Sequence, residues 1–317
     1  MSCRRLILLV LLLFSAARNT AQERAFWSVR PLQPQQSVYW ISTTYFEASE
    51  EFASAGFRRD LFRVATTDET TFPVTDARFI DRLVGLHYEY GYSRKLTLVG
   101  YLGFRSISTR YTETDFPQGI PTFLSKNIQS SGFTDLWIWA RYELLNPTKL
   151  RFPFRLAVQV GVKLPTGDIL APVALGTGML DYEARTLGEL TFFINRIPAY
   201  LLAETGYRLR NGDYKNQALY RAELGISAAE AVQLRIGFSG IASIGELRTL
   251  IGIGEIPRPA ATRPLNIIGD ERYGQVLLGL QANFSPTFAV LLDYQRRLYG
   301  NATFFGESIQ LSFAFLR

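Results

Sequence analysis

The sequence predicts an all-β fold: a transmembrane, antiparallel, up-and-down β-barrel of about twelve strands, with both chain ends on the periplasmic side. Three observations support this prediction. Apolar and polar residues alternate with period two along much of the chain. The alternating segments are even in number, and the linkers between them are by turns short and long. No segment after residue 21 is apolar and unbroken over the length of a spanning helix.

The alternation is clearest between Phe154 and Leu164, where apolar side chains take every second position and Arg155, Gln159 and Lys163 lie between them. In a barrel the apolar face contacts lipid and the polar face lines the lumen, whereas in a soluble sandwich the apolar face meets a core. The predicted strands cover residues 37–47, 79–92, 96–109, 132–145, 150–164, 179–195, 198–210, 218–228, 231–244, 273–284, 287–299 and 305–316.

The connections decide between these two folds. Outer-membrane barrels have tight periplasmic turns and long external loops, and a soluble sandwich has no reason to alternate its loop lengths in this way. The sequence therefore favours a membrane barrel over residues 37–317. Short turns are expected near residues 93, 146, 196, 229 and 285, and external loops at 48–78, 110–131, 165–178, 211–217, 245–272 and 300–304.

The first 21 residues have the features of an export signal. Two arginines precede the apolar run Leu6–Phe14, which is too short to span a bilayer. Cleavage is expected after Ala21, with Ala17 as an alternative. Residues 22–36 contain two prolines and no alternation, and they are expected to form a periplasmic segment or a small plug. The expected location is the outer membrane, with its lipid and the barrel-assembly machinery as partners.

Composition excludes several classes of function. Cys3 is the only cysteine and leaves with the signal, so the mature chain has no disulfide, thiolate metal site or cysteine nucleophile. Removal of the signal also removes three arginines and no acid, which lowers the formal charge from +6 to +3. The remaining basic residues are not clustered, so nucleic acid is not an expected partner.

The sequence gives no reason to expect an enzyme. Its single histidine, His87, shares the polar parity of Asp81, Gly85 and Glu89, and no His-x-Ser motif follows it. We therefore predict no catalytic residue, no metal site and no cofactor. A polar residue facing the lumen is the preferred interpretation of His87.

Charged residues of both signs lie on the parity expected to face the lumen. They are expected to pair across the interior and narrow it, which argues against a wide general pore, although simple hydration of a polar lumen is the alternative. The candidate lumen or substrate-binding residues are Trp137, Trp139, Arg141, Glu143, Lys163, Asp181, Glu183, Arg185, Glu204 and Arg208.

The two tryptophans of this set have more than one interpretation. On the polar parity, Trp137 and Trp139 would face the lumen and stack on an aromatic solute. A position in the interfacial aromatic girdle, or a bulge that turns both rings toward lipid, is the favoured alternative.

A loop motif follows the strand that ends at Leu164. Pro165 removes a donor and ends the strand, Gly167 permits a positive φ, and Asp168 caps the turn. The motif residues are Pro165, Thr166, Gly167, Asp168, Gly176 and Gly178. A rigid external loop without a ligand is the preferred interpretation, and a loop that gates the barrel mouth is the alternative.

Four short runs within residues 131–210 carry a family resemblance: SGFTDL at 131–136, ARYELL at 140–145, GVKLPTGD at 161–168 and LGTG at 175–178. They resemble motifs of the outer-membrane family named for meta-pathway phenol degradation, although Phe133 replaces a residue that is usually small or aliphatic. The first hundred residues show none of the family's motifs. The resemblance implies a barrel that carries hydrophobic or aromatic compounds inward.

The expected function is accordingly a channel or transporter for small hydrophobic or aromatic solutes. The alternatives are a structural or surface-interaction barrel without transport and an outer-membrane enzyme.

Overall fold

The computed structural model describes residues 29–317 except 63, 68, 69, 116–119, 147–152, 230, 248, 249, 252–264 and 266. The signal peptide expected over residues 1–21 lies outside this part of the chain. The described residues contain no helix that is long and apolar enough to cross a membrane.

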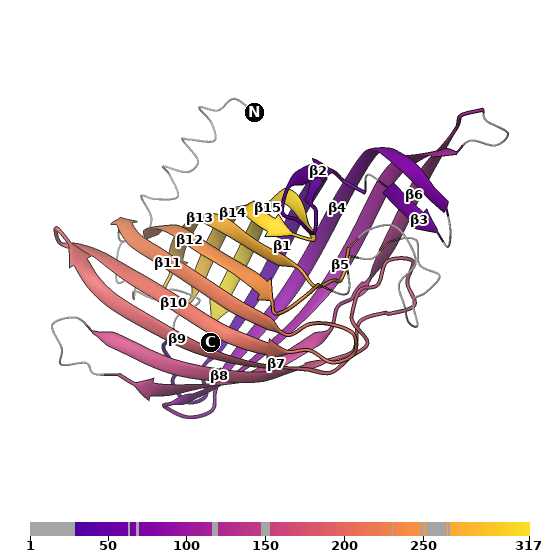
Figure 1. Cartoon of the computed structure of the whole chain (residues 1–317). Helices are drawn as coiled ribbons and strands as arrows, with labels where there is room; N and C mark the ends of the chain where they lie inside the picture. The colour runs from indigo at the N-terminus through magenta and orange to yellow at the C-terminus, as the bar shows by residue number, and fades with distance from the viewer. Residues whose placement is uncertain are drawn as a thin grey trace.

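The regular elements of the described residues are all strands (Figure 1). They are β1 (Ser37–Phe52), β2 (Arg58–Asp60), β3 (Val64–Thr67), β4 (Thr70–Gly91), β5 (Leu96–Asp115), β6 (Thr122–Phe133), β7 (Leu136–Leu145), β8 (Phe154–Leu164), β9 (Asp181–Ile194), β10 (Ile197–Leu209), β11 (Gln217–Ala229), β12 (Val232–Ser243), β13 (Arg272–Ser285), β14 (Phe288–Asn301) and β15 (Thr303–Leu316).

The strands form a closed antiparallel barrel. Neighbours along the chain pair with each other, and β1 pairs with both β4 and β15, which closes the sheet on itself. β6 and β7 are successive parts of one strand, because both pair with β5 and only Thr134 and Asp135 separate them. With β2 and β3 outside the ring, the barrel has the twelve strands that the sequence predicts.

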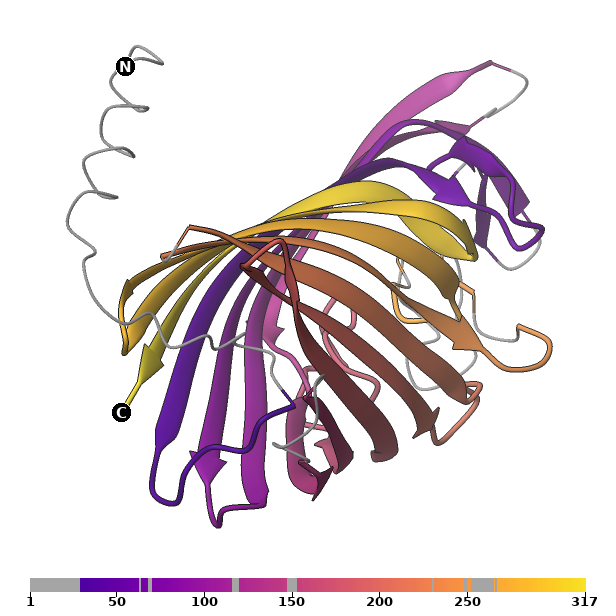
Figure 2. The ribbon, with the colours of Figure 1, turned by 90° about the vertical axis from the view of Figure 1, so that its left-hand side faces the viewer.

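The two ends of the barrel differ. At one end, here called the turn end, short connections such as Asn195–Arg196 join the strands and Ser37 lies beside Arg317. At the other, the loop end, lie the long connections. Here β4, β5 and β6 continue beyond the other strands and form a projecting sheet (Figures 1 and 2).

This projecting sheet corrects two predicted loops. Much of 48–78 and of 110–131 is strand, because β1 runs to Phe52, β4 begins at Thr70, β5 runs to Asp115 and β6 begins at Thr122. β6 is exposed on both faces over most of its length, so apolar residues need not alternate there. The alternation used to predict strands therefore stops before the strands do.

The outer face of the barrel carries a belt of exposed apolar side chains. Ile41, Leu86, Val160, Leu234 and Ile309 are each about half exposed. An apolar surface that runs around the whole barrel is unfavourable in water and is the surface that a membrane-spanning barrel presents to lipid. The belt confirms that the alternating apolar face points outward rather than into a core.

Residues at the start of the described chain enter the turn end of the lumen. The backbone N–H groups of Val29 and Leu32 donate to the side chains of Glu189 (3.2 Å) and Thr97 (3.1 Å). Arg30 pairs with the same Glu189 carboxylate. Val29 and Leu32 are buried, so this segment lies inside the barrel and not along its outer surface.

An apolar cluster fills one side of the loop end; we call it the loop-end cluster. It draws on the barrel strands, the 165–180 loop and Leu265, which forms a parallel bridge with Val173. Its buried members are Ala48, Leu61, Phe62, Val74, Phe79, Ile107, Tyr111, Ala171, Val173, Leu175, Leu265 and Phe304.

Candidate functional site

A group of ion pairs lies on the lumen wall toward the loop end, where it joins β9 and β10. The Glu183 carboxylate accepts from Arg185 (2.5 Å), Arg208 (2.8 Å) and the indole Nε1 of Trp139 (2.9 Å). Arg185 also binds Glu204 at 2.5 Å. A buried carboxylate with several donors is the arrangement that offsets its loss of hydration, so this group is a stable part of the lumen wall.

A second group of pairs lies beside the 165–180 loop. The Lys163 ammonium contacts Asp181 at 2.6 Å and Asp135 at 3.3 Å, and it donates to the hydroxyl of Thr177. All three charged side chains are buried. This group therefore ties β8 and β9 to the loop that connects them.

Several contacts join side chains on two strands that are separated by a third strand. They are possible because the strand between them has a glycine, and therefore no side chain, at that position. Arg235 on β12 pairs with Asp293 on β14, and Gly279 lies between them on β13. A Cβ at Gly279 would lie 2.4 Å from the Asp293 carboxylate. In the same way, a Cβ at Gly161 would lie 2.0 Å from the Trp139 ring, which crosses β8 to reach Glu183.

The structure brings most of the candidate lumen residues together. Arg141 and Glu143 lie apart from the rest, toward the turn end. Arg141 binds Glu89 at 2.9 Å, and that carboxylate also contacts His87 at 3.1 Å. Glu143 forms no ion pair with another described residue, and its Oε1 is buried without a hydrogen-bond partner there. The residues gathered around the ion pairs of Glu183 and Lys163 are Trp137, Trp139, Lys163, Asp181, Glu183, Arg185, Glu204 and Arg208.

The favoured interpretation of the tryptophans as girdle residues is wrong. Trp137 and Trp139 stack with ring centroids 5.1 Å apart, and Arg208 lies over the Trp137 ring at 4.8 Å. The register of β7 with β5 and β8 is unbroken over these residues, so no bulge turns the rings outward. Both rings face the lumen because they keep the parity of the charged residues around them.

The 165–180 loop is held by one carboxylate. Asp135 accepts from the backbone N–H of Gly167 and of Thr177, each at 3.0 Å. Gly167 and Gly176 pack against each other, and a Cβ at Gly176 would lie 2.3 Å from the Asp135 carboxylate. Two separate runs of the loop are thus pinned to the break between β6 and β7. We call this arrangement the Asp135 clip.

The motif residues of this loop have the following roles. β8 ends at Leu164, directly before Pro165, and the Thr166 hydroxyl accepts from the Leu136 N–H at 2.9 Å. Asp168 caps the turn through the N–H of Leu170 (2.7 Å) and of Ala171 (3.2 Å).

The expectation of a positive φ at Gly167 is wrong. The left-handed residue of this loop is Gly178, with φ of 68°. Gly167 is required instead by its close approach to Gly176, whose Cα would lie 2.8 Å from a Cβ at residue 167. A turn residue can thus be predicted from sequence while its physical reason is not.

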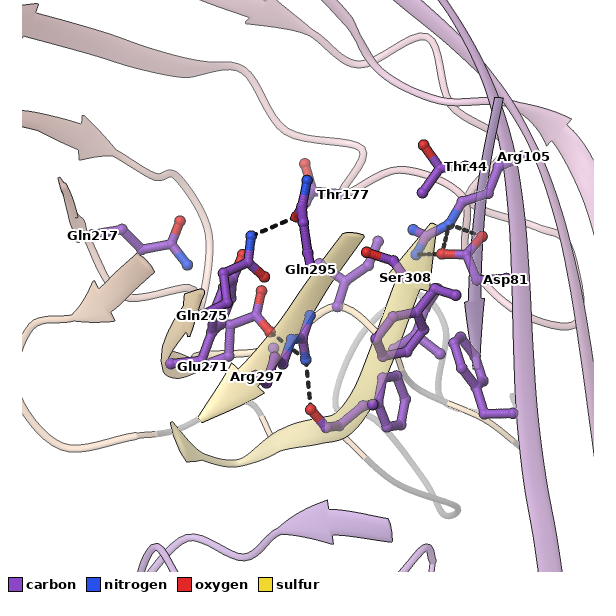
Figure 3. A pocket seen from close by; sticks show the side chains of 18 of the residues that line it. Thr44, Asp81, Arg105, Thr177, Gln217, Glu271, Gln275, Gln295, Arg297 and Ser308 are labelled. Atoms are coloured by element: carbon purple, nitrogen blue, oxygen red, sulfur yellow. Dashed lines mark hydrogen bonds and ion pairs between the residues drawn. The ribbon is translucent and has the colours of Figure 1, made fainter. Parts of the chain in front are cut away.

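A cavity of about 390 Å³ lies in the loop end of the lumen (Figure 3). One side is polar, with Gln275, Gln295 and Arg297 from β13 and β14. The lining also has an apolar patch at Phe46, and this ring packs against Phe79, which stacks on Phe304 in the loop-end cluster. The segment 267–271 covers part of the cavity. A cavity of this size has the dimensions of a small-molecule site.

Five basic and three acidic side chains line this cavity. Burial lowers the pKa of Arg210, although Asp181 and Asp270 oppose the shift. An arginine pKa starts so high that the side chain remains a cation near neutral pH. The basic residues are Arg105, Lys163, Arg208, Arg210 and Arg297, and the acidic ones are Asp81, Asp181 and Glu271.

The sequence did not single out the apolar patch of the cavity. Phe46 and Phe79 lie on the parity of Thr44 and Asp81, the parity that faces the lumen. Large apolar residues at lumen positions near strand ends were the signal that identifies this surface. An apolar residue at a strand end also fits the membrane interface, so the sequence alone does not place these residues in the lumen.

No family model matches the chain, and no curated protein matches it. A solved structure of an outer membrane channel from Pseudomonas putida F1 has a TM-score of 0.57 at 14% identity, over 93% of this chain and 100% of that chain. This likeness shows the fold: the chain is a barrel of the outer-membrane type.

Two further solved structures share less with the chain. The toluene transporter TodX of Pseudomonas putida has a TM-score of 0.40 at 10% identity, over 95% of each chain. The translocator domain of the autotransporter NalP from Neisseria meningitidis has a TM-score of 0.39 at 8% identity, over 98% of this chain and 95% of that chain. Barrels with such different roles share the architecture, and neither likeness carries an argument about function.

Proposed function

We propose that this chain is an outer-membrane channel for small hydrophobic or aromatic solutes. The observation that carries the proposal is the loop-end cavity, whose lining combines charged and amide side chains with an apolar patch at Phe46, inside a barrel whose outer surface is already apolar. A lumen that serves only as structural support has no need for a cavity with an apolar patch in its lining. The resemblance of residues 131–210 to the meta-pathway phenol-degradation family supports the same class of solute.

The charged lumen lining and the segment at the turn end favour a narrow path over a general pore. The Glu183 and Lys163 groups place buried ion pairs along one part of the lumen wall, among residues of β8, β9 and β10. Residues 29–32 enter the lumen from the turn end, and we propose that they act as a small plug there. A solute would pass only by moving between these groups, which suits small solutes and a low conductance.

The test is uptake by cells whose outer membrane carries the chain. Entry of a neutral ring-bearing solute, benzyl alcohol, should be faster than in cells without the chain, and entry of a sugar should not change. Equal entry of benzyl alcohol with and without the chain contradicts the proposal and favours a structural or surface barrel.

The same cells test the proposal that the chain is not an enzyme. His87 is buried, contacts Glu89 and lies 6.0 Å from Trp40, centroid to centroid. We expect His87→Ala to leave any lipase or protease activity of the membranes unchanged. Loss of a measurable hydrolase activity in this variant would assign His87 a catalytic role.

A further inference from the structure

Arg297 presents unused donors to the loop-end cavity. Its Nη1 donates to the Thr303 hydroxyl and to the Phe304 carbonyl (2.9 Å), and its nearest carboxylate, Glu271, is 4.0 Å away (Figure 3). Within the described part of the chain both of its hydrogen bonds use Nη1, so Nε and Nη2 keep N–H groups for a ligand. That edge of a guanidinium matches the two oxygens of a carboxylate.

The other cations of the cavity are more closely paired. Arg105 lies 2.5 Å from Asp81, and Lys163 lies 2.6 Å from Asp181. Arg208 pairs with Glu183 at 2.8 Å, and Arg210 lies 3.7 Å from Asp270, so carboxylates outside the lining also compensate these two cations. Arg297 is thus the place in the cavity where an incoming anion displaces the least existing pairing.

Aromatic rings surround the same guanidinium. Its carbon lies 4.3 Å from the ring centroid of Tyr273 and 5.2 Å from that of Phe46. Phe46 in turn meets Phe79 edge to face at 6.1 Å, and Phe79 stacks on Phe304 at 4.3 Å. A charged group and an apolar patch therefore adjoin within one cavity.

We propose that this cavity binds small organic anions with an apolar body, of which an aromatic monocarboxylate is the simplest example. The carboxylate pairs with Nε and Nη2 of Arg297, and the apolar body lies against Phe46, which itself packs on the Phe79–Phe304 pair. This inference rests on the proposed channel function and narrows its substrate class from hydrophobic solutes in general to amphipathic anions. A neutral aromatic solute would gain only the apolar contact with Phe46. A small polar anion would gain only the ion pair with Arg297.

Binding is measured on the purified full chain in a neutral detergent by the fluorescence of its tryptophans, since Trp137 lines the cavity. The probes are benzoate, benzyl alcohol and acetate, which carry the ring with charge, the ring alone and the charge alone. Benzoate should bind most tightly, and added salt should weaken it. Arg297→Gln should weaken benzoate about tenfold or more and leave benzyl alcohol unchanged.

The chain offers a matched control one residue away. Arg296 lies on the same strand but points outward and pairs with Glu307, with about half of its side chain exposed. Arg296→Gln should bind benzoate as the parent does. Arg297→Lys, which keeps the charge without the planar fork, should fall between the parent and Arg297→Gln, and heat-modifiable migration on gels verifies folding of each variant.

Two outcomes overturn the inference: equal binding of benzoate and benzyl alcohol, or benzoate binding unchanged in Arg297→Gln. Neither outcome bears on the channel itself, which the uptake of benzyl alcohol by cells decides. Conversely, cells that fail to take up benzyl alcohol would overturn the channel while a specific benzoate titration still stood.

Discussion

Trp137 and Trp139 lie face to face in the lumen because the wall beside them has no side chain at Gly161. The period-two alternation of the sequence places both residues on the parity that faces the lumen. The girdle interpretation is favoured by a different fact, since tryptophans are common at membrane interfaces. The decisive fact was the glycine on the next strand, which makes room for the Trp139 ring. Strand register, which a single sequence does not show, determines such pairs.

These two rings give a prediction at the residue scale. The double variant Trp137→Ala/Trp139→Ala should slow uptake of a hydrophobic solute about two- to tenfold, because it removes the two stacked indole rings beside the ion pairs of Glu183. The double variant with phenylalanine at both positions keeps two rings and should stay near the parental rate. Uptake at the parental rate by the folded alanine variant would show that the rings have no part in transport.

The Asp135 clip gives a second prediction at the same scale. Gly176→Ala places a methyl group against the Asp135 carboxylate and should break the two backbone hydrogen bonds that this carboxylate accepts, at a cost of about 1.5–3 kcal/mol each. The 165–180 loop should then be cut faster by protease while the barrel remains heat-modifiable. Gly100→Ala is the control, because a Cβ there meets no atom within 4 Å. Equal cutting of both variants would contradict the clip.

At the scale of elements, the described start of the chain leads to another prediction. Val29 and Leu32 are buried in the turn end of the lumen and hydrogen-bond to Glu189 and Thr97. A variant that lacks residues 22–36 should therefore show a higher single-channel conductance in planar bilayers than the full chain. Glu189→Gln, which weakens the pair with Arg30, should give a smaller increase. An unchanged conductance in the deletion variant would exclude a plug.

The elements also show how far the sequence could be read. Inside the lipid belt each strand has one apolar and one polar face, so its position and parity were predictable from alternation alone. Beyond the belt, β6 presents polar residues on both faces, such as Ser125 and Lys126, so alternation predicts a loop there and not a strand. The closed ring followed from the even count and the loop lengths, whereas the cavity depends on contacts among Phe46, Phe79 and Phe304 that come from separate strands.

At the scale of the whole molecule, the two ends of the barrel can be assigned to the two sides of the membrane. The loop end should be external and the turn end periplasmic. Single cysteines at Ser125 in β6 and at Asn146 after β7 test this, since both positions are exposed and the only native cysteine lies in the expected signal. An impermeant maleimide should label intact cells at residue 125 and should label residue 146 only after permeabilisation. The reverse pattern would invert the topology.

The closure of the ring has a kinetic consequence. β1 is held between β4 and β15, and the backbone of Ser37 exchanges two hydrogen bonds of 2.8 Å with Arg317. One edge of β1 can pair early with β4, whereas its other edge is paired only when β15, the last strand, is available, and a pairing between strands so far apart in sequence is intrinsically slow. Until the ring closes, both edge strands of the sheet have unpaired backbone groups that can bind other chains. We therefore expect the chain to need chaperone protection until β1 and β15 have paired.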